Sequence, residues 1–349
     1  MLFFLGELLQ NWWGPFRLLT SHLFLGGFGL LASALLTWVL LPRLVGLVPR
    51  DRGRSHAVQS SAAQGKPTGV GVIFVSIFVL VQLLVMPPNF ESFAVLILTS
   101  LSCAFGFLDD RATLAWGEYK KGLLDLLICV LGAAALSGLK DVTIWLPFTK
   151  YLFTVPEWLF IPAATILLWA AINCTNCTDG VDGLSGTLVM IALMSIGGLL
   201  YFGLGHERIA AYFLLPHYTD GANWAIMAFS MVGCLAGYLW YNAHPSQMLM
   251  GDAGSRALGF LLGVLVIESG NPFVIFMVAG VLLVNGGTGL VKVALLRFAR
   301  IAIFRDIRFP LHDHVRHKHG WSNPQVLVRF AMVQAILALV LLVLLLKIR

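Results

Sequence analysis

Charge is scarce in this sequence, and its scarcity excludes several kinds of protein. Of the 349 residues, 11% are Asp, Glu, Lys or Arg and 58% are hydrophobic, whereas about 25% of the residues in an ordinary soluble domain are charged. This balance excludes a soluble globular protein and a disordered chain. A collagen-like period, a heptad array, a low-complexity linker and longer internal repeats are also missing, so a transporter built from inverted repeats has no support in the sequence.

Cysteine is scarce as well. The chain has five cysteines, which lie in or beside apolar segments: Cys103, Cys129, Cys174, Cys177 and Cys234. This placement argues against a disulfide framework. Cys174 and Cys177 form a C-x-x-C pair, a spacing typical of redox motifs and of half a zinc site. Because there is no second pair and no thioredoxin-like pattern, we interpret both as small residues that pack in their loop.

What the sequence has in abundance is long apolar runs. Crossing roughly 30 Å of hydrocarbon takes about 20 helical residues, and ten segments approach that length: 23–42, 69–87, 92–108, 122–138, 156–172, 183–203, 222–241, 254–268, 272–296 and 326–346. The fourth and eighth are short enough to be re-entrant in part. The first 21 residues lack the features of a signal peptide and are expected to stay in the mature protein. We predict an all-α fold, in which residues 1–349 form one polytopic membrane bundle of about ten transmembrane helices.

Lys and Arg are unevenly divided between the two sets of loops. Fourteen of the 23 lie in loops that follow odd-numbered segments, and six lie in the other loops or near the chain ends. Because cytoplasmic loops carry the excess of basic residues, we predict that the odd-numbered loops are cytoplasmic and that both termini are external, on the periplasmic side. The same bias accounts for the net charge of +6, so we expect a lipid bilayer and no nucleic acid as partner.

Polar residues gather in four clusters on the predicted cytoplasmic side. They follow the third, fifth, seventh and ninth segments, at 107–110 (FLDD), 173–183 (NCTNCTDGVDG), 250–255 (MGDAGS) and 310–314 (PLHDH). Any one cluster has a simpler explanation, because Asp, Asn and Gly commonly cap helices and form turns. Four clusters on one face, with Asp and Asn beside hydrocarbon where polar groups are costly, indicate a functional site.

The residue types in these clusters favour phosphate chemistry with Mg²⁺. Carboxylate and amide oxygens suit Mg²⁺, which in proteins usually bridges substrate phosphates. The carboxylates available are Asp109, Asp110, Asp179, Asp182 and Asp252. Glycines allow backbone N–H groups to approach phosphate, and the lysines at 120 and 121 add positive charge. The His-rich run 312–319 resembles a zinc tract, but its interleaved Arg and Lys favour a phosphate-facing surface.

Over its whole length the chain resembles the polyprenyl-phosphate N-acetylhexosamine-1-phosphate transferases. Three motifs are similar to those of the whole superfamily: Asp109-Asp110, the block N-x-x-N-x-x-D-G-x-D-G-L at 173–184, and M-G-D-x-G-S-x-A-L-G at 250–259. A fourth motif is P-L-H-x-H at 310–314, followed by G-W-S-x-P-Q-V-x-V-R-F at 320–330. This last pattern resembles the branch that uses a muropeptide donor.

The resemblance implies a Mg²⁺-dependent enzyme of the bacterial cytoplasmic (inner) membrane, with ten transmembrane helices and an active site facing the cytoplasm. The implied reaction moves phospho-MurNAc-pentapeptide from UDP-MurNAc-pentapeptide to undecaprenyl phosphate and gives lipid I and UMP. Two alternatives stay open. One is a sugar-1-phosphate transferase that uses UDP-GlcNAc or another UDP-HexNAc, and the other is a secondary transporter or channel. The sequence also leaves open whether the chain forms a homodimer.

The resemblance assigns roles to individual residues. Asp252 is similar to the family's Mg²⁺ ligand, and Asp109 and Asp110 match the pair assigned to the lipid phosphate or its activation, with metal binding as a second role for each. The other catalytic positions are Asn176, Asp179, His312 and His314. The positions similar to those that bind substrate or nucleotide are Lys66, Lys121, Asn173, Gly180, Val181, Asp182 and Leu249.

Three departures from the family pattern lie on the nucleotide side. Asp313 stands in the middle of what is usually a run of three histidines. Leu249 replaces the aromatic residue that stacks on uracil three residues before the Mg²⁺ aspartate. The first cytoplasmic loop reads QGKPTGVG at 64–71 where GTPTMGG is expected.

Two further departures lie within predicted helices. Asp125 follows Lys121 by one turn where the family has Lys-x-x-x-Gln, and Arg256 occupies a normally apolar position. Both place a charged side chain in a segment that is otherwise largely apolar.

Two reaction routes are chemically open. A lipid phosphate is already anionic near neutral pH, so it can displace UMP directly with little help from a base, while the enzyme positions two anions and stabilises the charge that develops. A two-step route would pass through a phosphorylated Asp109 or Asp110. We favour direct displacement.

Overall fold

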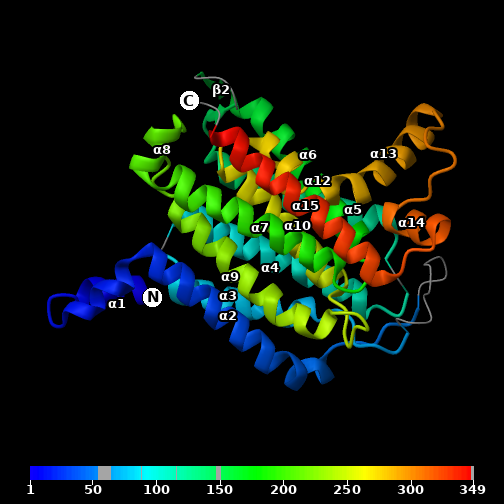
Figure 1. The fold of residues 1–349 in the computed structure, drawn as a ribbon, viewed down its shortest axis with the longest axis horizontal. Helices are drawn as coiled ribbons and strands as arrows, with labels where there is room; N and C mark the ends of the chain where they lie inside the picture. The colour runs from blue at the N-terminus through cyan, green and yellow to red at the C-terminus, as the bar shows by residue number, and fades with distance from the viewer. Residues whose placement is uncertain (54–63, 88, 115, 147–150, 347–349) are drawn as a thin grey trace.

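Each apolar segment predicted to cross a membrane forms a helix, continuous or broken, in the computed structural model, which describes residues 1–53, 64–87, 89–114, 116–146 and 151–346 (Figure 1). Seven helical stretches in these residues are long and apolar enough to span a bilayer: His22–Leu47, Phe90–Arg111, Glu157–Thr178, Leu184–Leu204, Gly221–Asn242, Gly280–Ala299 and Asn323–Val340. The prediction of an all-α, multi-pass membrane protein is therefore confirmed. The count of ten spans and the external position of both termini stay predictions.

The long helices are α2 (His22–Leu44), α3 (Gly71–Val85), α4 (Phe90–Arg111), α5 (Glu118–Ser137), α6 (Glu157–Thr178), α7 (Leu184–Gly198), α9 (Gly221–Asn242), α10 (Gly251–Glu268) and α15 (Asn323–Leu346). The short α-helices are α1 (Leu2–Leu9), α8 (Glu207–Phe213) and α14 (Leu311–His319). Predicted spans four and eight, which are short enough to be re-entrant in part, form the continuous helices α5 and α10. Both fall outside the seven apolar stretches, and both carry charged residues.

Two features depart from the predicted pattern. The ninth apolar segment is interrupted at Ala279, which follows α11 (Ile275–Val278). After it, α12 (Gly280–Leu282), η6 (Leu283–Gly287), α13 (Thr288–Ala294) and η7 (Leu295–Ala299) form one helix in which η6 and η7 are π-helical. Strands β1 (Val142–Trp145) and β2 (Leu152–Val155) form an antiparallel hairpin in which Val142 pairs with Val155.

Four of the basic residues counted in the prediction of orientation lie outside the described residues: Arg54, Lys150, Lys347 and Arg349.

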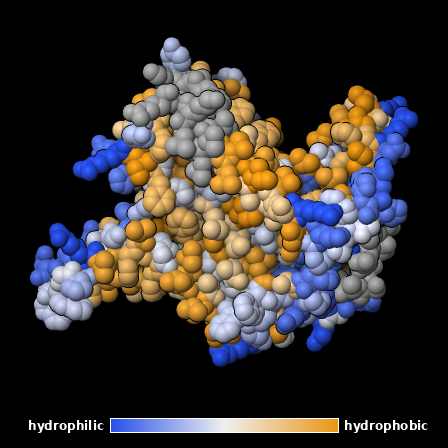
Figure 2. Space-filling view, in the orientation of Figure 1, coloured by the Kyte–Doolittle hydropathy of each residue, from blue (hydrophilic) through white to orange (hydrophobic). Residues whose placement is uncertain are grey.

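Helix α10 is the centre of the bundle and packs against α3, α4 and α6. Every residue from Gly251 to Ile267 is buried. A helix that is apolar nearly all round, with Gly and Ala among its small residues, is suited to such a position. On the face drawn in Figure 2, the surface is apolar over the middle of the bundle, and hydrophilic surface gathers at the end that includes α14.

Glycines let α3 and α4 approach the first turn of α10 closely. A Cβ atom on Gly71 of α3 would lie 2.1 Å from the backbone nitrogen of Gly254. A Cβ atom on Gly106 of α4 would lie 2.3 Å from the backbone oxygen of Asp252. Because both contacts are made by backbone atoms, any larger residue would have to displace the start of α10.

We therefore expect Gly106→Ala to lower the free energy of unfolding by about 1–3 kcal/mol, the usual cost of overpacking. Gly27→Ala is the matched control, because a Cβ atom there would meet nothing within 4 Å in the interior of α2. Thermal unfolding of both variants in detergent tests this expectation. Equal unfolding temperatures for the two variants would contradict the close packing of α4 on α10.

Candidate active site

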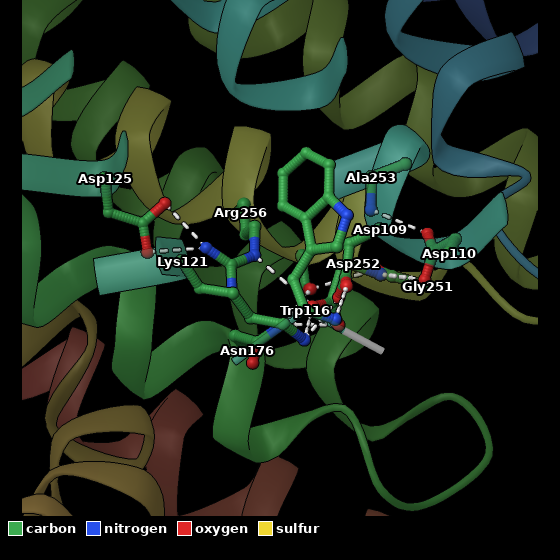
Figure 3. Close-up of polar contacts among 11 residues, drawn as sticks. Asp109, Asp110, Trp116, Lys121, Asp125, Asn176, Gly251, Asp252, Ala253 and Arg256 are labelled. Atoms are coloured by element: carbon green, nitrogen blue, oxygen red, sulfur yellow. Dashed lines mark hydrogen bonds and ion pairs between the residues drawn. The ribbon is translucent and has the colours of Figure 1, made fainter. Parts of the chain in front are cut away.

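The first turn of α10 carries Asp252 and is fixed in place by Asp110 of α4. The Asp110 carboxylate accepts the backbone N–H groups of Asp252 and Ala253, each at 3.0 Å, and so caps the helix from a neighbouring element (Figure 3). Gly251 has φ +68°, and a Cβ atom there would lie 2.3 Å from Oδ2 of Asp110. Glycine is therefore required at this position both by its backbone conformation and by the space available.

Lys121 of α5 lies between two carboxylates. Its Nζ forms an ion pair with Oδ2 of Asp109 and a second one, at 3.1 Å, with Oδ2 of Asp252 (Figure 3). The other oxygen of Asp109 accepts the backbone N–H of Trp116 at 2.7 Å, just before α5 begins. Lys121 thus joins the C-terminal end of α4 to the N-terminal end of α10 through one cation.

The Asp252 carboxylate is held on both of its oxygens. Oδ1 accepts a hydrogen bond from Nδ2 of Asn176 on α6 at 3.0 Å, and the same amide nitrogen lies 2.9 Å from Oγ of Ser255. Oδ2 faces Lys121 and also Nε of Arg256 at 3.4 Å. Asp252 is only 4% exposed, so its charge depends on these neighbours for stabilisation.

The donor set fits a Mg²⁺ ion that is completed by a substrate. Asp109 and Asp252 already share a single cation, the Lys121 ammonium, so their carboxylates are close enough to act on one positive charge. Among the described residues, no group of three or more His, Cys, Asp or Glu could form an all-protein metal site. In proteins Mg²⁺ is commonly bound through one or two carboxylates plus phosphate oxygens and water, and two carboxylates on one cation are what this site offers. Both Asp110 oxygens, in contrast, face the amide groups of α10.

A second polar cluster surrounds Asp182 in the loop between α6 and α7. The Asp182 carboxylate accepts hydrogen bonds from Oγ of Ser246 at 2.7 Å and from its N–H at 3.2 Å, and it lies 2.8 Å from Nδ1 of His244. Nζ of Lys66 donates to Oγ of Ser246 at 3.0 Å. Burial alone would raise the pKa of Asp182, but the hydrogen bonds from Ser246 and His244 outweigh it and lower the pKa. The carboxylate is therefore ionised at neutral pH.

Backbone hydrogen bonds hold the first loop against this cluster. The N–H of Leu249 donates to the carbonyl of Pro67 at 2.8 Å, and the N–H of Val70 donates to the carbonyl of Leu249 at 3.2 Å. The loop that carries Lys66 is thus paired with the segment that leads into α10.

His312 is buried in α14 and reaches α6 through Asn285. Its backbone N–H donates to Oδ1 of Asn285 at 2.8 Å, and Nδ2 of Asn285 donates to Oγ1 of Thr178 at 3.0 Å. Gly180 makes room for the ring, because a Cβ atom there would lie 2.5 Å from Nε2 of His312. Burial, together with the nearby positive charge of Arg316, lowers the pKa of His312 to about 3. His312 is therefore neutral at pH 7 and can offer a hydrogen bond but no positive charge.

The remaining predicted residues lie around these groups. Asn173 donates from Nδ2 to the carbonyl of Trp169 within α6, Asp179 is the C-terminal cap of that helix, and Val181 is buried. His314 accepts the backbone N–H of Arg308 at 3.2 Å. The structure thus links all four predicted polar clusters, since α4, α6 and α10 meet at Asp252 and α14 joins α6 through Asn285.

Several partners of the site residues carry no motif in the sequence. Asn285 is one of them, although an Asn within an apolar run is a usable signal, because such residues are costly in a membrane. His244 and Ser246, which contact Asp182, lie outside the four predicted clusters. Asp125 and Arg256 stand out in the sequence only as separate departures from a family pattern, which does not predict their contact.

The buried, neutral His312 predicts a pH-dependent stability. Below the ordinary histidine pKa of 6.5 the unfolded chain takes up a proton that the folded chain does not, until the pH approaches about 3. The free energy of unfolding should therefore fall as the pH drops below 6.5, by up to about 1.4 kcal/mol per pH unit, with no contribution above pH 7. Thermal unfolding of His312→Asn should show a shallower dependence between pH 6.5 and 5. His317→Asn, an exposed position on the same helix, should keep the wild-type slope, and equal slopes in all three proteins would contradict the burial of a neutral ring.

Comparison with known proteins agrees with this arrangement. A family model described as glycosyl transferase family 4 matches residues 92–270, about half of the chain, and this range contains Asp109, Lys121, Asn176 and Asp252. The curated relatives match over nearly the full length.

Three of these relatives carry the name phospho-N-acetylmuramoyl-pentapeptide-transferase. The protein of Treponema pallidum (strain Nichols) is 52% identical over 344 residues, which cover 98% of this chain and 95% of the relative. The protein of Gemmatimonas aurantiaca is 31% identical, with 95% of each chain covered. The protein of Aquifex aeolicus is 29% identical, with 97% of this chain and 98% of the relative covered. The chain therefore belongs to glycosyl transferase family 4 and, within it, to the phospho-N-acetylmuramoyl-pentapeptide-transferases.

Proposed function

We propose that this chain transfers phospho-MurNAc-pentapeptide from UDP-MurNAc-pentapeptide to undecaprenyl phosphate, with release of UMP and formation of lipid I. The observation that carries the proposal is the constellation around Asp252, where Lys121, Asp109 and Asn176 converge on the N-terminal turn of a buried helix. Family membership gives the donor and acceptor their identity. The site has the groups that such a reaction needs: carboxylates for a divalent cation, and the Lys121 ammonium for phosphate oxygens.

We propose that Asp252 and Asp109 hold Mg²⁺ in the working enzyme. The bound ion would neutralise negative charge on the diphosphate of the donor as UMP leaves. Lys121 now pairs with both carboxylates, and its flexible side chain can turn to a phosphate oxygen once another cation takes its place. Asn176 keeps Oδ1 of Asp252 fixed during this exchange.

Direct attack by the lipid phosphate is the favoured route. Both Asp110 oxygens accept N–H groups of α10, so using Asp110 as a nucleophile would cost the cap of that helix. Asp109 is bound by the Trp116 amide and by Lys121, which also lowers its reactivity as a nucleophile. These contacts favour positioning and electrostatic stabilisation over a phosphorylated aspartate.

We propose that the site faces the cytoplasm and that the bundle spans the inner membrane ten times. The proposal rests on α3, α5 and α10, which are helical although they are shorter or more charged than the seven apolar stretches. It also rests on the distribution of basic residues, since the clusters containing Lys66, Lys121 and Arg316 share one end of the bundle with Asp252. A soluble UDP-linked donor would reach the site from that side.

Purified protein incubated with UDP-MurNAc-pentapeptide, undecaprenyl phosphate and Mg²⁺ should produce UMP and lipid I. Asp252→Asn should reduce UMP release by about 100-fold or more, because it removes charge from the centre while it keeps the shape of the side chain. Glu207→Gln, an exposed change on α8, should retain wild-type activity. UMP release is measured by chromatography, and lipid I by mass spectrometry.

A donor exchange separates the alternatives. UMP release from UDP-GlcNAc but not from the muropeptide donor would overturn the proposed substrate and favour a sugar-1-phosphate transferase. Substrate flux across proteoliposomes without UMP release would favour a transporter. Full activity of Asp252→Asn would contradict the proposed centre.

A further inference from the structure

A second ion pair, between Arg256 and Asp125, lies next to Asp252 and is buried in the bundle. Nη1 of Arg256 lies 2.6 Å and 2.5 Å from the two carboxylate oxygens of Asp125 (Figure 3). Arg256 is 6% exposed and Asp125 is 2% exposed. A buried ion pair of this kind is costly to break, because removing either partner leaves an uncompensated charge.

Arg256 also contacts the proposed catalytic centre. It follows Asp252 by four residues on α10, so both side chains lie on one face of the helix, and its Nε is 3.4 Å from Oδ2 of Asp252. Oδ2 is the same oxygen that Lys121 approaches, whereas Asn176 holds Oδ1. If Lys121 turns to a substrate phosphate, Arg256 remains as the cation that fixes Oδ2.

The two residues also balance each other in charge. Asp109, Asp252 and Lys121 together carry a formal charge of −1. Adding Asp125 and Arg256 leaves this charge at −1, because the pair is neutral. An apolar residue at 256 together with an amide at 125 would give the same total. Asp125 and Arg256 therefore leave the formal charge of the centre unchanged only when both are present.

We propose that Arg256 is a positioning residue that fixes the Asp252 carboxylate, and that Asp125 is its counter-charge, so that the pair sets the affinity of the centre for a divalent cation. This inference rests on the proposed function, because it assumes that Asp252 binds the cation. It assigns one joint role to two residues on separate helices, α5 and α10.

The proposal predicts opposite effects for the two single substitutions. Asp125→Asn raises the formal charge of the centre to 0 and should weaken divalent-cation binding by about tenfold, as expected for one charge a few ångströms away in a partly screened interior. Arg256→Leu lowers the charge to −2 and should strengthen binding by about tenfold. The double variant returns the charge to −1 and should bind within about threefold of the wild type. A pair that only stabilises the fold would shift binding in one direction in both single variants, or in neither.

The experiment is a titration of the full-length protein in detergent with Mn²⁺, followed by electron paramagnetic resonance of the free ion, with no substrate present. Glu118→Gln is the matched control, because it removes the same unit of charge from an exposed position on α5 and should bind Mn²⁺ like the wild type. UMP release gives the second measurement. Arg256→Leu should combine tighter Mn²⁺ binding with a kcat at least tenfold lower, because Oδ2 of Asp252 has lost its anchor.

Arg256→Lys and Asp125→Asn keep the test decisive if Arg256→Leu does not fold. The lysine variant preserves the charge of the centre and should bind Mn²⁺ like the wild type, while its kcat falls because the two-sided contact of the guanidinium is lost. Mn²⁺ affinity that is the same in Asp125→Asn and the wild type would overturn the inference alone. No Mn²⁺ binding by the wild type would overturn the proposed metal centre as well.

Discussion

The two hydrogen bonds from the first turn of α10 to the Asp110 carboxylate fix the position on which the other contacts of the site depend. They define where α10 begins, and α10 presents Asp252 to Lys121 from α5 and to Asn176 from α6. The cap works only because Gly251 leaves room for the carboxylate and Gly106 lets α4 lie against the helix backbone. A carboxylate at a helix N-terminus is also favoured by the helix dipole, so the cap stabilises α10 electrostatically as well as sterically.

Around this cap, charge is concentrated where the bundle is otherwise apolar. Helices α5 and α10, which lie outside the seven apolar stretches, pair charged residues with each other: Lys121 with Asp252, and Asp125 with Arg256. In a low-dielectric setting such pairs are stable only when every member has a partner, which explains why the charges occur as a connected group. Because these charges are connected through Lys121, a bound cation or an anionic substrate would rearrange their ion pairs: the cation would compete with Lys121 for the carboxylates, and the substrate would offer Lys121 another anion.

The sequence was sufficient to predict the helices and the polar clusters of the site. Both can be assessed from the local sequence, because one depends on the length of an apolar run and the other on the cost of a polar residue beside hydrocarbon. It predicted that Asp109, Asn176 and Asp252 belong to one region, and the structure brings them within hydrogen-bonding or ion-pair distance of shared partners. It did not predict that Asp125 meets Arg256, since the two are 131 residues apart and nothing in the local pattern of either residue identifies the other. Nor did it predict the π-helical stretch η6, in which Asn285 lies beside His312, because apolar periodicity does not distinguish a π turn from an α turn.

A structure of the protein with Mn²⁺ and a UDP-linked donor analogue, with the ion located by its anomalous scattering, tests the central claim most directly. We expect the ion within about 2.1 Å of an Asp252 oxygen, as is usual for a small divalent cation, with the Lys121 ammonium moved from the carboxylates to a phosphate oxygen. The Asp110 carboxylate should still accept both N–H groups of α10. An ion bound by Asp110 with the cap of α10 open, or an ion that is not in contact with Asp252, would contradict the role assigned to this helix.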